Sequence, residues 1–339
     1  MMNRKVTEAI GLFILVGVLL FAPGSGWSQE DEATVAIPAV SLTFCPNYIA
    51  DGMGFWEKEG LKVTLKSVRG IGAANAVLAG SIEFSNSSGP TVIRANARGQ
   101  RLFAIASTLE RPTVEIVLSK EAAQKAGVDS DSSLEKKAQA LRGRKIAVDS
   151  INSVVHGYLK YFARKGGVDP EKEITISPMA PPNMLAALKK GAIDGYTMSL
   201  PWPIIPVHSG ATIRLVSSPR GDLPELNPFA YNMVLTRADF CDSKPQVCEK
   251  FVAGIQHALK YMQEKPEESL EILRKTFGKM DPAVLEEAFE LIRQSSSKTG
   301  KIDEYSLAQA QDFMLATEIL KDSEKITSFS SIYTNRFVK

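Results

Sequence analysis

Two short serine-rich loops contain the residues most able to bind a polar ligand. The first, SNSSGP, follows the predicted strand Ile82–Ser85 and precedes a helical pattern that begins near Thr91. It offers the hydroxyls of Ser87 and Ser88 and the backbone amide of Gly89. The start of a helix has unpaired amide hydrogens and a partial positive charge, so an anionic or carbonyl oxygen would be stabilised there. The alternative is that one serine only caps the helix.

The loop DSINS repeats this arrangement further along the chain. It follows the predicted strand Lys145–Val148 and places Ser150, Asn152 and Ser153 at the start of a helix from Val154. That helix needs a cap, and Ser153 is the expected one. Ser150 and Asn152 therefore remain available for a ligand.

The sequence contains no recognisable machinery for catalysis. The three histidines, His156, His208 and His257, have no cysteine or carboxylate at metal-ligand spacing, so no metal site is expected. The segment GIGAAN has Asn75 where a dinucleotide loop needs glycine or alanine, and it is interpreted as a turn. A G-x-S-x-G nucleophile motif is also missing. We expect a binding protein that has no cofactor and is not an enzyme.

Residues 1–28 are predicted to be a cleavable secretory signal. Arg4 and Lys5 precede an apolar run from Ala9 to Ala22, which leads into small residues and a cleavage point after Ser28. A membrane anchor is the alternative, but this run would make only about 21 Å of helix, short of a ~30 Å bilayer core. The mature chain is therefore expected to be a periplasmic monomer that is not embedded in a membrane.

The net charge and the cysteines bear on the partners and the covalent links that this protein could have. Removal of residues 1–28 lowers the formal net charge from +2 to +1, which argues against a nucleic-acid partner. Cys241 and Cys248 are close enough to bridge a strand end to the next helix, with two independent buried thiols as the alternative. Cys45 would then be free, either as a small buried hydrophobe or as a reactive group.

Short apolar runs alternate with amphipathic stretches, which predicts an α/β fold. Strands are expected at Val40–Phe44 and Leu61–Val68, among others, and residues 246–322 are expected to be almost entirely helical, with a C-terminal strap after Lys325. One pattern recurs: a helix, a glycine stop and a strand that opens with an acid, at Glu83 and again at Asp194. This repeat favours two similar lobes, joined near residues 108–114 and 213–228.

Four segments in this order resemble the nitrate, sulfonate, taurine and thiamine-precursor group of type II periplasmic binding proteins. They are PNYIADGMGFWEKEGLKVTL, ANAVLAGSIEFSNSSGPTVIRANARGQ, LRGRKIAVDS and PPNMLAALKKGAIDGYTM. The resemblance implies two α/β lobes, with mixed sheets flanked by helices and a ligand cleft between the lobes. Lobe 1 is predicted to comprise residues 34–112 plus 240–339, and lobe 2 to comprise residues 113–239.

The resemblance also suggests further ligand contacts. Tyr48, beside Asn47, matches a ligand-facing position of the family, and Ser199 and Trp202 lie in a loop, Ser199–Pro206, that faces the ligand in relatives. Trp202 would supply an apolar wall. Thr108, at the first predicted crossover, completes the predicted set. The loop lacks the acid that relatives often have before its proline, so the identity of the ligand does not follow.

The resulting hypothesis is a periplasmic substrate-binding component of an ABC importer. It would capture a small polar or anionic organic solute by lobe closure and deliver it to a permease driven by an ATPase. One alternative is a solute-binding module that feeds a membrane sensor. Another is an enzyme similar to thiamine-pyrimidine synthases, but the cysteine-rich motif of those proteins is absent.

Overall fold

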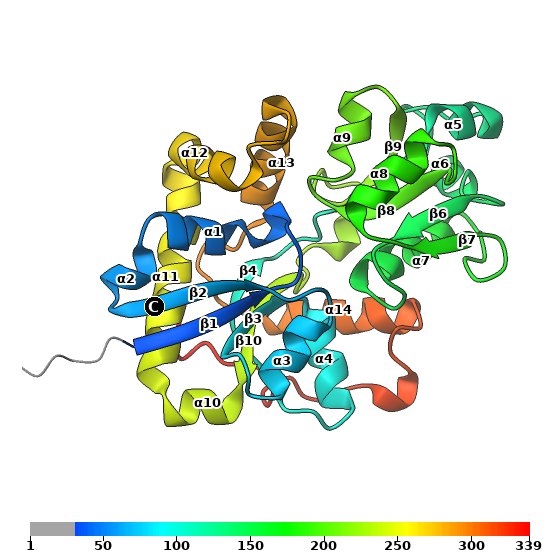
Figure 1. The fold of residues 1–339 in the computed structure, drawn as a ribbon. Coiled ribbons are helices and arrows are strands. Elements are labelled where there is room, and N and C mark those ends of the chain that lie inside the picture. Colours follow the sequence, from blue (N-terminus) through cyan, green and yellow to red (C-terminus); the bar gives the residue numbers. More distant parts are fainter. Residues whose placement is uncertain (1–30) are drawn as a thin grey trace, which may run out of the picture. The chain divides into compact units, whose positions relative to one another are not determined.

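The computed structural model describes residues 31–339, so the predicted signal segment 1–28 lies outside the described residues. The described strands form two five-stranded sheets (Figure 1). The first has the order β2-β1-β3-β10-β4, with β1 Asp31–Ile37, β2 Leu61–Ser67, β3 Phe84–Ser87, β4 Leu102–Leu109 and β10 Asn232–Arg237. The second has the order β7-β6-β8-β5-β9, with β5 Val114–Ser119, β6 Lys145–Val148, β7 Thr175–Pro178, β8 Gly195–Ser199 and β9 Thr212–Ser217.

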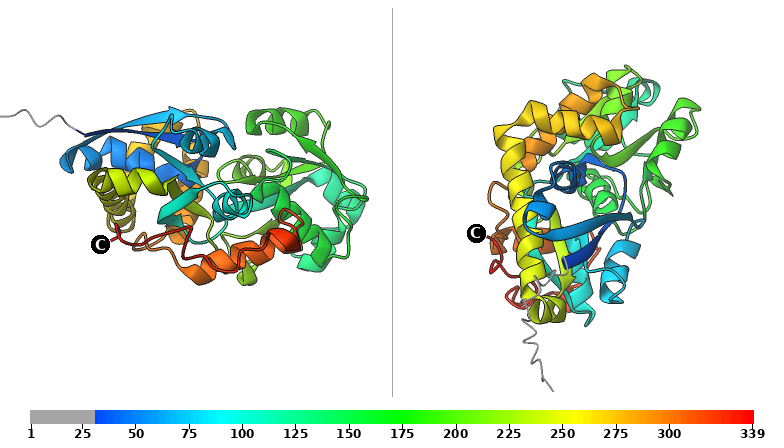
Figure 2. Two further views of the ribbon diagram at one scale, coloured as in Figure 1. Left: turned by 90° about the horizontal axis from the view of Figure 1, so that it is seen from below. Right: turned by 60° about the vertical axis from the view of Figure 1, so that its left-hand side comes forward.

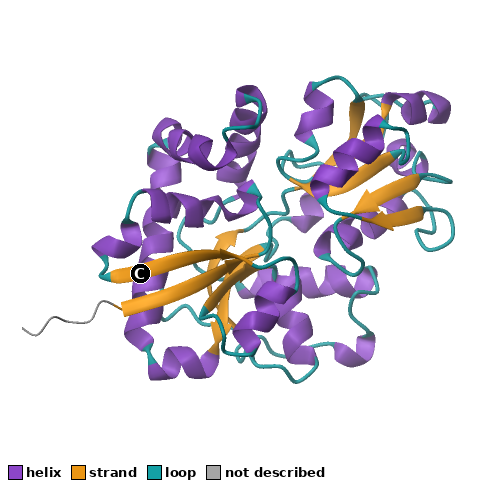
Figure 3. Ribbon diagram, viewed as in Figure 1, coloured by secondary structure: helices purple, strands orange, loops and turns teal. Residues whose placement is uncertain are grey.

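Both sheets follow one plan. In the first, β1 pairs in parallel with β2 and β3, while β10 is antiparallel to β3 and β4. In the second, β6 pairs in parallel with β7 and β8, while β5 is antiparallel to β8 and β9. Helices lie around both groups of strands (Figure 3). The predicted fold class, two mixed sheets flanked by helices, is confirmed.

The helices between these strands are short. In the first half they are α1 Cys45–Gly52, α2 Phe55–Lys58, α3 Gly72–Leu78 and α4 Gly89–Ala97; in the second half they are α5 Lys120–Ala126, α6 Leu134–Gln139, α7 Val154–Lys165, α8 Pro181–Lys189 and α9 Ile204–His208. The C-terminal part adds α10 Ala238–Ser243, α11 Pro245–Glu264, α12 Pro266–Phe277, α13 Pro282–Ser295 and α14 Glu304–Ala316. Pro266 and Pro282 stand at helix starts, where the first turn needs no amide hydrogen from them.

The repeated acid has the same role in both sheets. Glu83 accepts a hydrogen bond through Oε2 from the amide of Thr34 in β1, at 2.8 Å. Asp194 accepts one through Oδ2 from the amide of Lys145 in β6, also at 2.8 Å. The glycine before each acid, Gly80 and Gly191, has a positive φ that ends the preceding helix. The sequence repeat therefore reflects a structural repeat.

The prediction of a first strand at Val40–Phe44 is wrong. Strand β1 lies earlier, at Asp31–Ile37, and Leu42–Phe44 forms a short 3-10 helix that leads into α1. Leu42 and Phe44 are buried as they would be in a strand, although Val40 is exposed. Ser41 caps the turn by accepting a hydrogen bond from the Thr43 amide at 3.2 Å. Buried apolar runs of this length do not distinguish a strand from a short helix.

Helix α11 covers the core of the first sheet. The Phe251 ring stacks on Phe84 and on Trp56, with ring centroids 4.0 and 5.1 Å apart. Trp56 is fully buried, and its Nε1 donates a hydrogen bond to the Phe251 carbonyl at 3.0 Å. A β-carbon at Gly254 would lie 2.1 Å from the indole ring, so only glycine allows this close packing.

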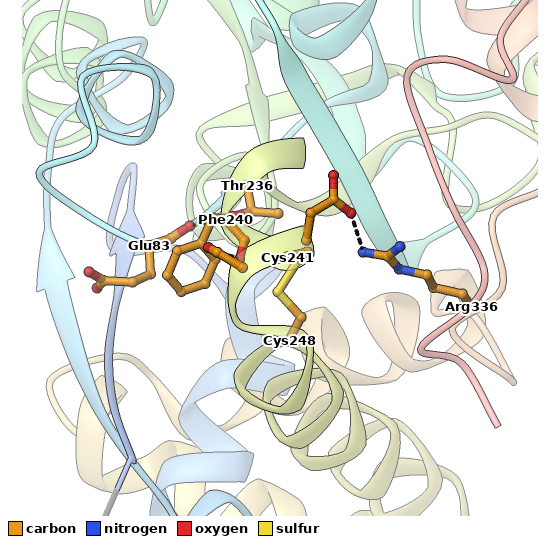
Figure 4. Close-up of a disulfide and its surroundings, with 8 residues drawn as sticks. Glu83, Thr236, Phe240, Cys241, Cys248 and Arg336 are labelled. Carbon is orange, nitrogen blue, oxygen red and sulfur yellow. Dashed lines mark hydrogen bonds and ion pairs between the residues drawn. A yellow bond between two sulfur atoms is a disulfide. The ribbon is translucent and has the colours of Figure 1, made fainter.

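Segments from the end of the chain fasten the first sheet. Cys241 of α10 and Cys248 of α11 form a disulfide, with Cα atoms 5.8 Å apart, and Asp242 pairs with Arg336 at 2.9 Å (Figure 4). The C-terminal tail runs back along this half of the chain (Figure 2), where the Thr334 amide donates to the Ala104 carbonyl in β4 at 2.9 Å. The expected C-terminal strap is thus present.

The chain crosses between the sheets twice, at residues 110–113 and again before Asn232. The second crossing lies between the end of β9 at Ser217 and the start of β10 at Asn232. It therefore overlaps the later part of the predicted range 213–228 and extends just beyond it. Strand β10 belongs to the first sheet, although the predicted lobe 2, residues 113–239, includes it. Sheet membership would end that lobe before Asn232. The lobe ranges otherwise stay predictions.

Candidate functional site

A polar cavity of about 460 Å³ lies where loops from both sheets converge. The first sheet contributes the segments that follow β1 and β2, the end of β3 and the face of α4. The second contributes the β6–α7 loop and the end of β8, and Tyr231 and Asn232 at the second crossing complete the wall. Loops beyond the carboxyl ends of strands are the usual ligand-binding places in α/β proteins. We call this space the polar cavity.

Six predicted ligand contacts line the polar cavity: Ser87, Ser88, Ser150, Asn152, Ser153 and Ser199. They come from both sheets, so the structure brings together the two serine-rich loops that are far apart in sequence. Sequence reasoning found five of them because each serine-rich loop lies between a strand and a helix start, and it found Ser199 through the family resemblance. Their contact with a ligand stays a prediction.

Five predicted contacts lie outside the lining of the polar cavity: Asn47, Tyr48, Gly89, Thr108 and Trp202. Asn47 and Tyr48 fall within α1 instead of directly after a strand, because β1 ends earlier than expected. Asn47 is buried and accepts a hydrogen bond from Asn86 at 3.0 Å, while Tyr48 packs edge-on against Phe277.

Gly89 and Thr108 support the cavity from behind its wall. The Gly89 amide donates to the Ala230 carbonyl at 2.9 Å, so it is not free for a ligand, and a β-carbon at Gly89 would lie 2.5 Å from that oxygen. Thr108 donates through Oγ1 to the Asn232 side-chain oxygen at 2.8 Å. Asn232 itself lines the cavity, so Thr108 holds a wall residue in place.

The N-terminus of α7 is capped as predicted. Ser153 accepts a hydrogen bond from the His156 amide at 3.1 Å and donates one to Asp149 at 2.6 Å. His156 also fixes this loop, because its Nδ1 accepts a hydrogen bond from the Asn152 amide at 2.9 Å. Burial lowers the pKa of His156, which favours the neutral ring that this bond requires. The hydroxyl of Ser150 makes no hydrogen bond within residues 31–339.

At the start of α4, by contrast, no serine side chain caps the helix. Ser87 donates to the hydroxyl of Thr91 at 3.0 Å, and the hydroxyls of Ser88 and Thr91 are also 3.0 Å apart. These three hydroxyls form a cluster that faces the polar cavity. The first-turn amides are already used, because Gly89 donates to the Ala230 carbonyl, Thr91 donates to the Ser88 carbonyl and Pro90 has no amide hydrogen. Hydroxyl groups suit an oxyanion better than an apolar group.

Two arginines that sequence reasoning missed line the polar cavity. Arg94 on α4 donates through Nη1 to the carbonyl of Asn152 at 2.9 Å, which links α4 to the β6–α7 loop. Burial lowers the pKa of Arg94, but a guanidinium still stays charged at neutral pH. The sequence contained one signal for Arg94, which is its spacing from Ser88 and Thr91. These three residues recur every third position and so share one helix face. Arg69 lies in the turn after β2, where no such spacing exists.

One carboxylate lies in the same cavity. Asp149 directly follows β6, and burial raises its pKa, while the hydrogen bond from Ser153 acts in the opposite direction. Tyr231 stands on the neighbouring wall, with its hydroxyl 2.6 Å from that of Ser199. Burial raises the pKa of Tyr231 to about 12, and the negative charge of Asp149 contributes to this. The phenol is therefore neutral and can donate or accept hydrogen bonds.

A second, more apolar cavity of about 910 Å³ contains Trp202. It lies between α9 and the connection from α12 to α13, and it is lined by the apolar side chains Val40, Trp202, Ile205, Phe277, Met280 and Val284, among others. The Ser41 hydroxyl donates to the Leu200 carbonyl at 2.9 Å. Ser41 lines the polar cavity, whereas the adjacent residues Val40 and Pro201 line the apolar one. Trp202 thus stands in a different cavity from the serines.

Two properties of the described residues bear on other functions. Residues 31–339 contain no cluster of three or more histidine, cysteine, aspartate or glutamate side chains that could hold a metal ion. Within the same range no helix has the length and apolar character needed to cross a membrane. Cys45 is buried against Met262, and burial raises the pKa of its thiol.

The fold matches those of solved periplasmic binding proteins. The alkanesulfonate-binding protein SsuA of Xanthomonas axonopodis pv. citri, bound to MOPS, superposes with a TM-score of 0.69 at 17% identity, over 86% of this chain and 95% of that one. The nitrate-binding protein NrtA of Synechocystis PCC 6803 superposes with a TM-score of 0.62 at 19% identity, over 76% of this chain and 69% of that one. At these identities the likeness establishes the fold.

The chain belongs to the NMT1-like family, whose sequence pattern matches residues 28–274. Among curated relatives, the nitrate import ATP-binding protein NrtC of Synechocystis sp. is 25% identical over 254 residues, which cover 72% of this chain and 37% of the relative. The alignments span between 26% and 37% of the length of the first three curated relatives.

Proposed function

We propose that this protein is the periplasmic substrate-binding component of an ABC importer and that it binds a small organic anion in the polar cavity. The observation that carries the proposal is the position of Arg94, a half-buried cation beside three hydroxyls and the start of α4. An anion there would receive charge-assisted hydrogen bonds, which are stronger than neutral ones. The names of the relatives, which refer to nitrate and alkanesulfonate, agree with an anionic solute.

The mechanism follows from the two walls of the cavity. A solute that contacts Ser88 and Arg94 on one wall and Ser150 on the other binds best when the walls are close together. Only this difference in affinity can shift the protein from an open to a closed arrangement. The closed form would then dock on a permease whose ATPase drives import, and the secretory signal predicted for residues 1–28 would place this exchange in the periplasm.

The proposal is tested by binding measurements on the mature chain. A thermal-shift screen over sulfonates, carboxylates, nitrate and bicarbonate should identify anions that raise the melting temperature, because a ligand of the native state stabilises it. Calorimetry with the best anion should then show that Arg94→Met weakens binding about tenfold or more, since a hydrogen bond to a charged group is lost.

The matched control is Arg98→Met. Arg98 ends the same helix, but it pairs with Glu324 at 2.9 Å on the surface and does not line the polar cavity. Its replacement should leave the affinity unchanged. Equal affinities of the wild type and Arg94→Met, or a screen in which no anion stabilises the protein, would contradict the proposed function.

A further inference from the structure

Helix α13 is joined to the second sheet through Glu287, which pairs with two arginines. Its Oε1 lies 3.2 Å from Nη2 of Arg214 in β9 and also pairs with Arg220, in the turn that follows β9. Glu115 of β5 is fully buried, and its carboxylate lies 2.9 Å from Nε of Arg214 and 3.8 Å from Nε of Arg220. Carboxylates and guanidinium groups therefore alternate in one network, and Glu287 is its member from α13.

Glu318 makes a similar connection just after α14. It lies 3.0 Å from Nη2 of Arg164 and 3.7 Å from Nζ of Lys160, both on α7, the helix between β6 and β7 of the second sheet. Arg164 also donates to the carbonyl of Ala316, the last residue of α14. Lys160 is buried, and Glu171 pairs with it at 2.5 Å, so this lysine keeps a partner when Glu318 is replaced.

Both C-terminal helices are fastened to the first sheet as well. Ser295, the last residue of α13, accepts a hydrogen bond from the amide of Glu110, directly after β4, at 2.9 Å. Helix α14 packs against α4, which lies between β3 and β4. A movement of the second sheet away from the first therefore acts on the ion pairs of Glu287 and Glu318.

Neither glutamate lines the polar cavity, but the ion pairs belong to an arrangement in which its two walls touch. The walls meet where Arg94 of α4 donates to the Asn152 carbonyl at 2.9 Å. Helix α7 begins at this cavity, where Ser153 caps it, and carries Arg164 near its other end. The pair of Arg164 with Glu318 thus holds the helix that positions one wall.

We propose that Glu287 and Glu318 form an ionic latch that favours the arrangement with the cavity walls close together, and that the latch raises solute affinity although neither glutamate touches the solute. The inference rests on the proposed function and adds to it two positioning residues outside the cavity. Apparent affinity scales with the fraction of protein in the binding-competent arrangement, so opening the latch weakens binding. Dissolved salt screens the latch, because its glutamates are 33% and 65% exposed.

The test compares the mature wild type with the double variant Glu287→Gln/Glu318→Gln, which removes both charges and keeps the shape of the side chains. Without solute, small-angle X-ray scattering at about 20 mM NaCl should give a larger radius of gyration for the variant. About 300 mM NaCl should enlarge the wild type but not the variant. Calorimetry with the anion that gives the largest thermal shift should show binding weakened at least about threefold in the variant.

The matched control is Glu286→Gln/Asp312→Asn, which removes the same charge from α13 and α14. Both carboxylates are exposed and make no ion pair within residues 31–339. Radius and affinity of this control should equal those of the wild type. Circular dichroism shows whether each variant is folded, and the salt dependence of the wild type tests the latch without any substitution.

The outcomes separate the latch from the proposed function. If the latch variant has the radius and affinity of the control, or salt leaves the wild-type radius unchanged, the latch is excluded while an anion-binding cavity stands. If the variant and salt both enlarge the protein but no anion binds the wild type, the latch between the sheets is supported and the proposed function is contradicted.

Discussion

At the scale of single residues, local rules predict caps and core packing better than they predict the position of charges. The need of a helix start for a cap predicts the role of Ser153, and the structure confirms it. The Trp56 indole is fully buried in the core, the usual place for a large apolar side chain. Such rules do not predict the role of Arg94, because an arginine on a helix is usually solvated. Only the folded chain brings Arg94 beside Asn152. Contacts between distant loops are not contained in local patterns.

The charge of Asp149 should make the ligand-free protein less stable as pH rises. Burial raises its pKa above the ordinary 3.8, so the folded protein holds this proton more tightly than the unfolded chain does. Its stabilising contribution is therefore complete below pH 3.8 and is lost as pH rises through the higher, folded-state pKa. The charged and polar side chains around Asp149 include those of Arg69, Arg94, Tyr231 and Ser153. The Asp149→Asn substitution leaves all four in place, so the comparison with the wild type reports the charge of Asp149.

Asp149→Asn should accordingly melt at a higher temperature than the wild type at pH 7.5, with a smaller difference at pH 4. The measurement is the melting temperature of both proteins by circular dichroism at the two pH values, without ligand. A variant that is less stable than the wild type at pH 7.5 would mean that the ionised carboxylate stabilises the loop, contrary to this prediction.

At the scale of elements, the positions of glycines and acids predict more than the apolar runs do. The repeated helix, glycine and acid pattern corresponds to one hydrogen bond in each sheet, from Glu83 and from Asp194. The predicted strand at residues 40–44, by contrast, is absent, and Leu42–Phe44 within it form a 3-10 turn. A glycine stop or a capping acid acts through its own backbone and nearest neighbours, whereas a buried run takes the conformation that its distant partners impose.

The two serines of the β6–α7 loop should separate stability from binding. Ser153→Ala should lower the free energy of unfolding by about 1 kcal/mol, because the cap of α7 is lost. Ser150→Ala should leave stability unchanged, since its hydroxyl makes no hydrogen bond within the described chain, but it should weaken binding of the solute found by the screen. Urea unfolding and calorimetry on both variants measure the two effects. Equal stability losses in the two variants would contradict this assignment.

The close contact between Gly89, at the start of α4, and Ala230 gives a further prediction. A β-carbon at Gly89 would lie 2.5 Å from the Ala230 carbonyl oxygen and 2.6 Å from the Ala230 side chain. Gly89→Ala should therefore cost about 1–3 kcal/mol of unfolding free energy, because packed backbone must move. The control is Gly72→Ala at the start of α3, where the nearest atom to the added carbon is 3.4 Å away, on the Val68 side chain. Equal unfolding free energies for wild type and Gly89→Ala in urea would show that this contact is not tight.

At the scale of the whole molecule, the resemblance and the repeat together predict two similar α/β halves, and both sheets follow one strand plan. The sequence does not assign β10, because an apolar strand does not reveal which sheet it joins. The position of Trp202 is also beyond local patterns. Its loop lies near the polar cavity, but the side chain lines the cavity formed with α12 and α13, and these helices come much later in the chain.

Solute binding should make the mature protein more compact. A ligand that contacts both walls of the polar cavity favours the closed arrangement, so small-angle X-ray scattering should give a smaller radius of gyration with saturating solute than without it. The Arg94→Met variant at the same solute concentration should show a smaller decrease, because less of it is bound. An identical radius in the presence and absence of a solute that calorimetry shows to be bound would contradict closure.

The location of the bound solute tests the central claim most directly. A crystal structure of the mature chain, grown with the best solute from the screen, should show it in the polar cavity. Its anionic group should lie within hydrogen-bond distance of Arg94 and Ser88. Solute bound beside Trp202 in the apolar cavity, or on the surface with the polar cavity empty, would contradict the claim.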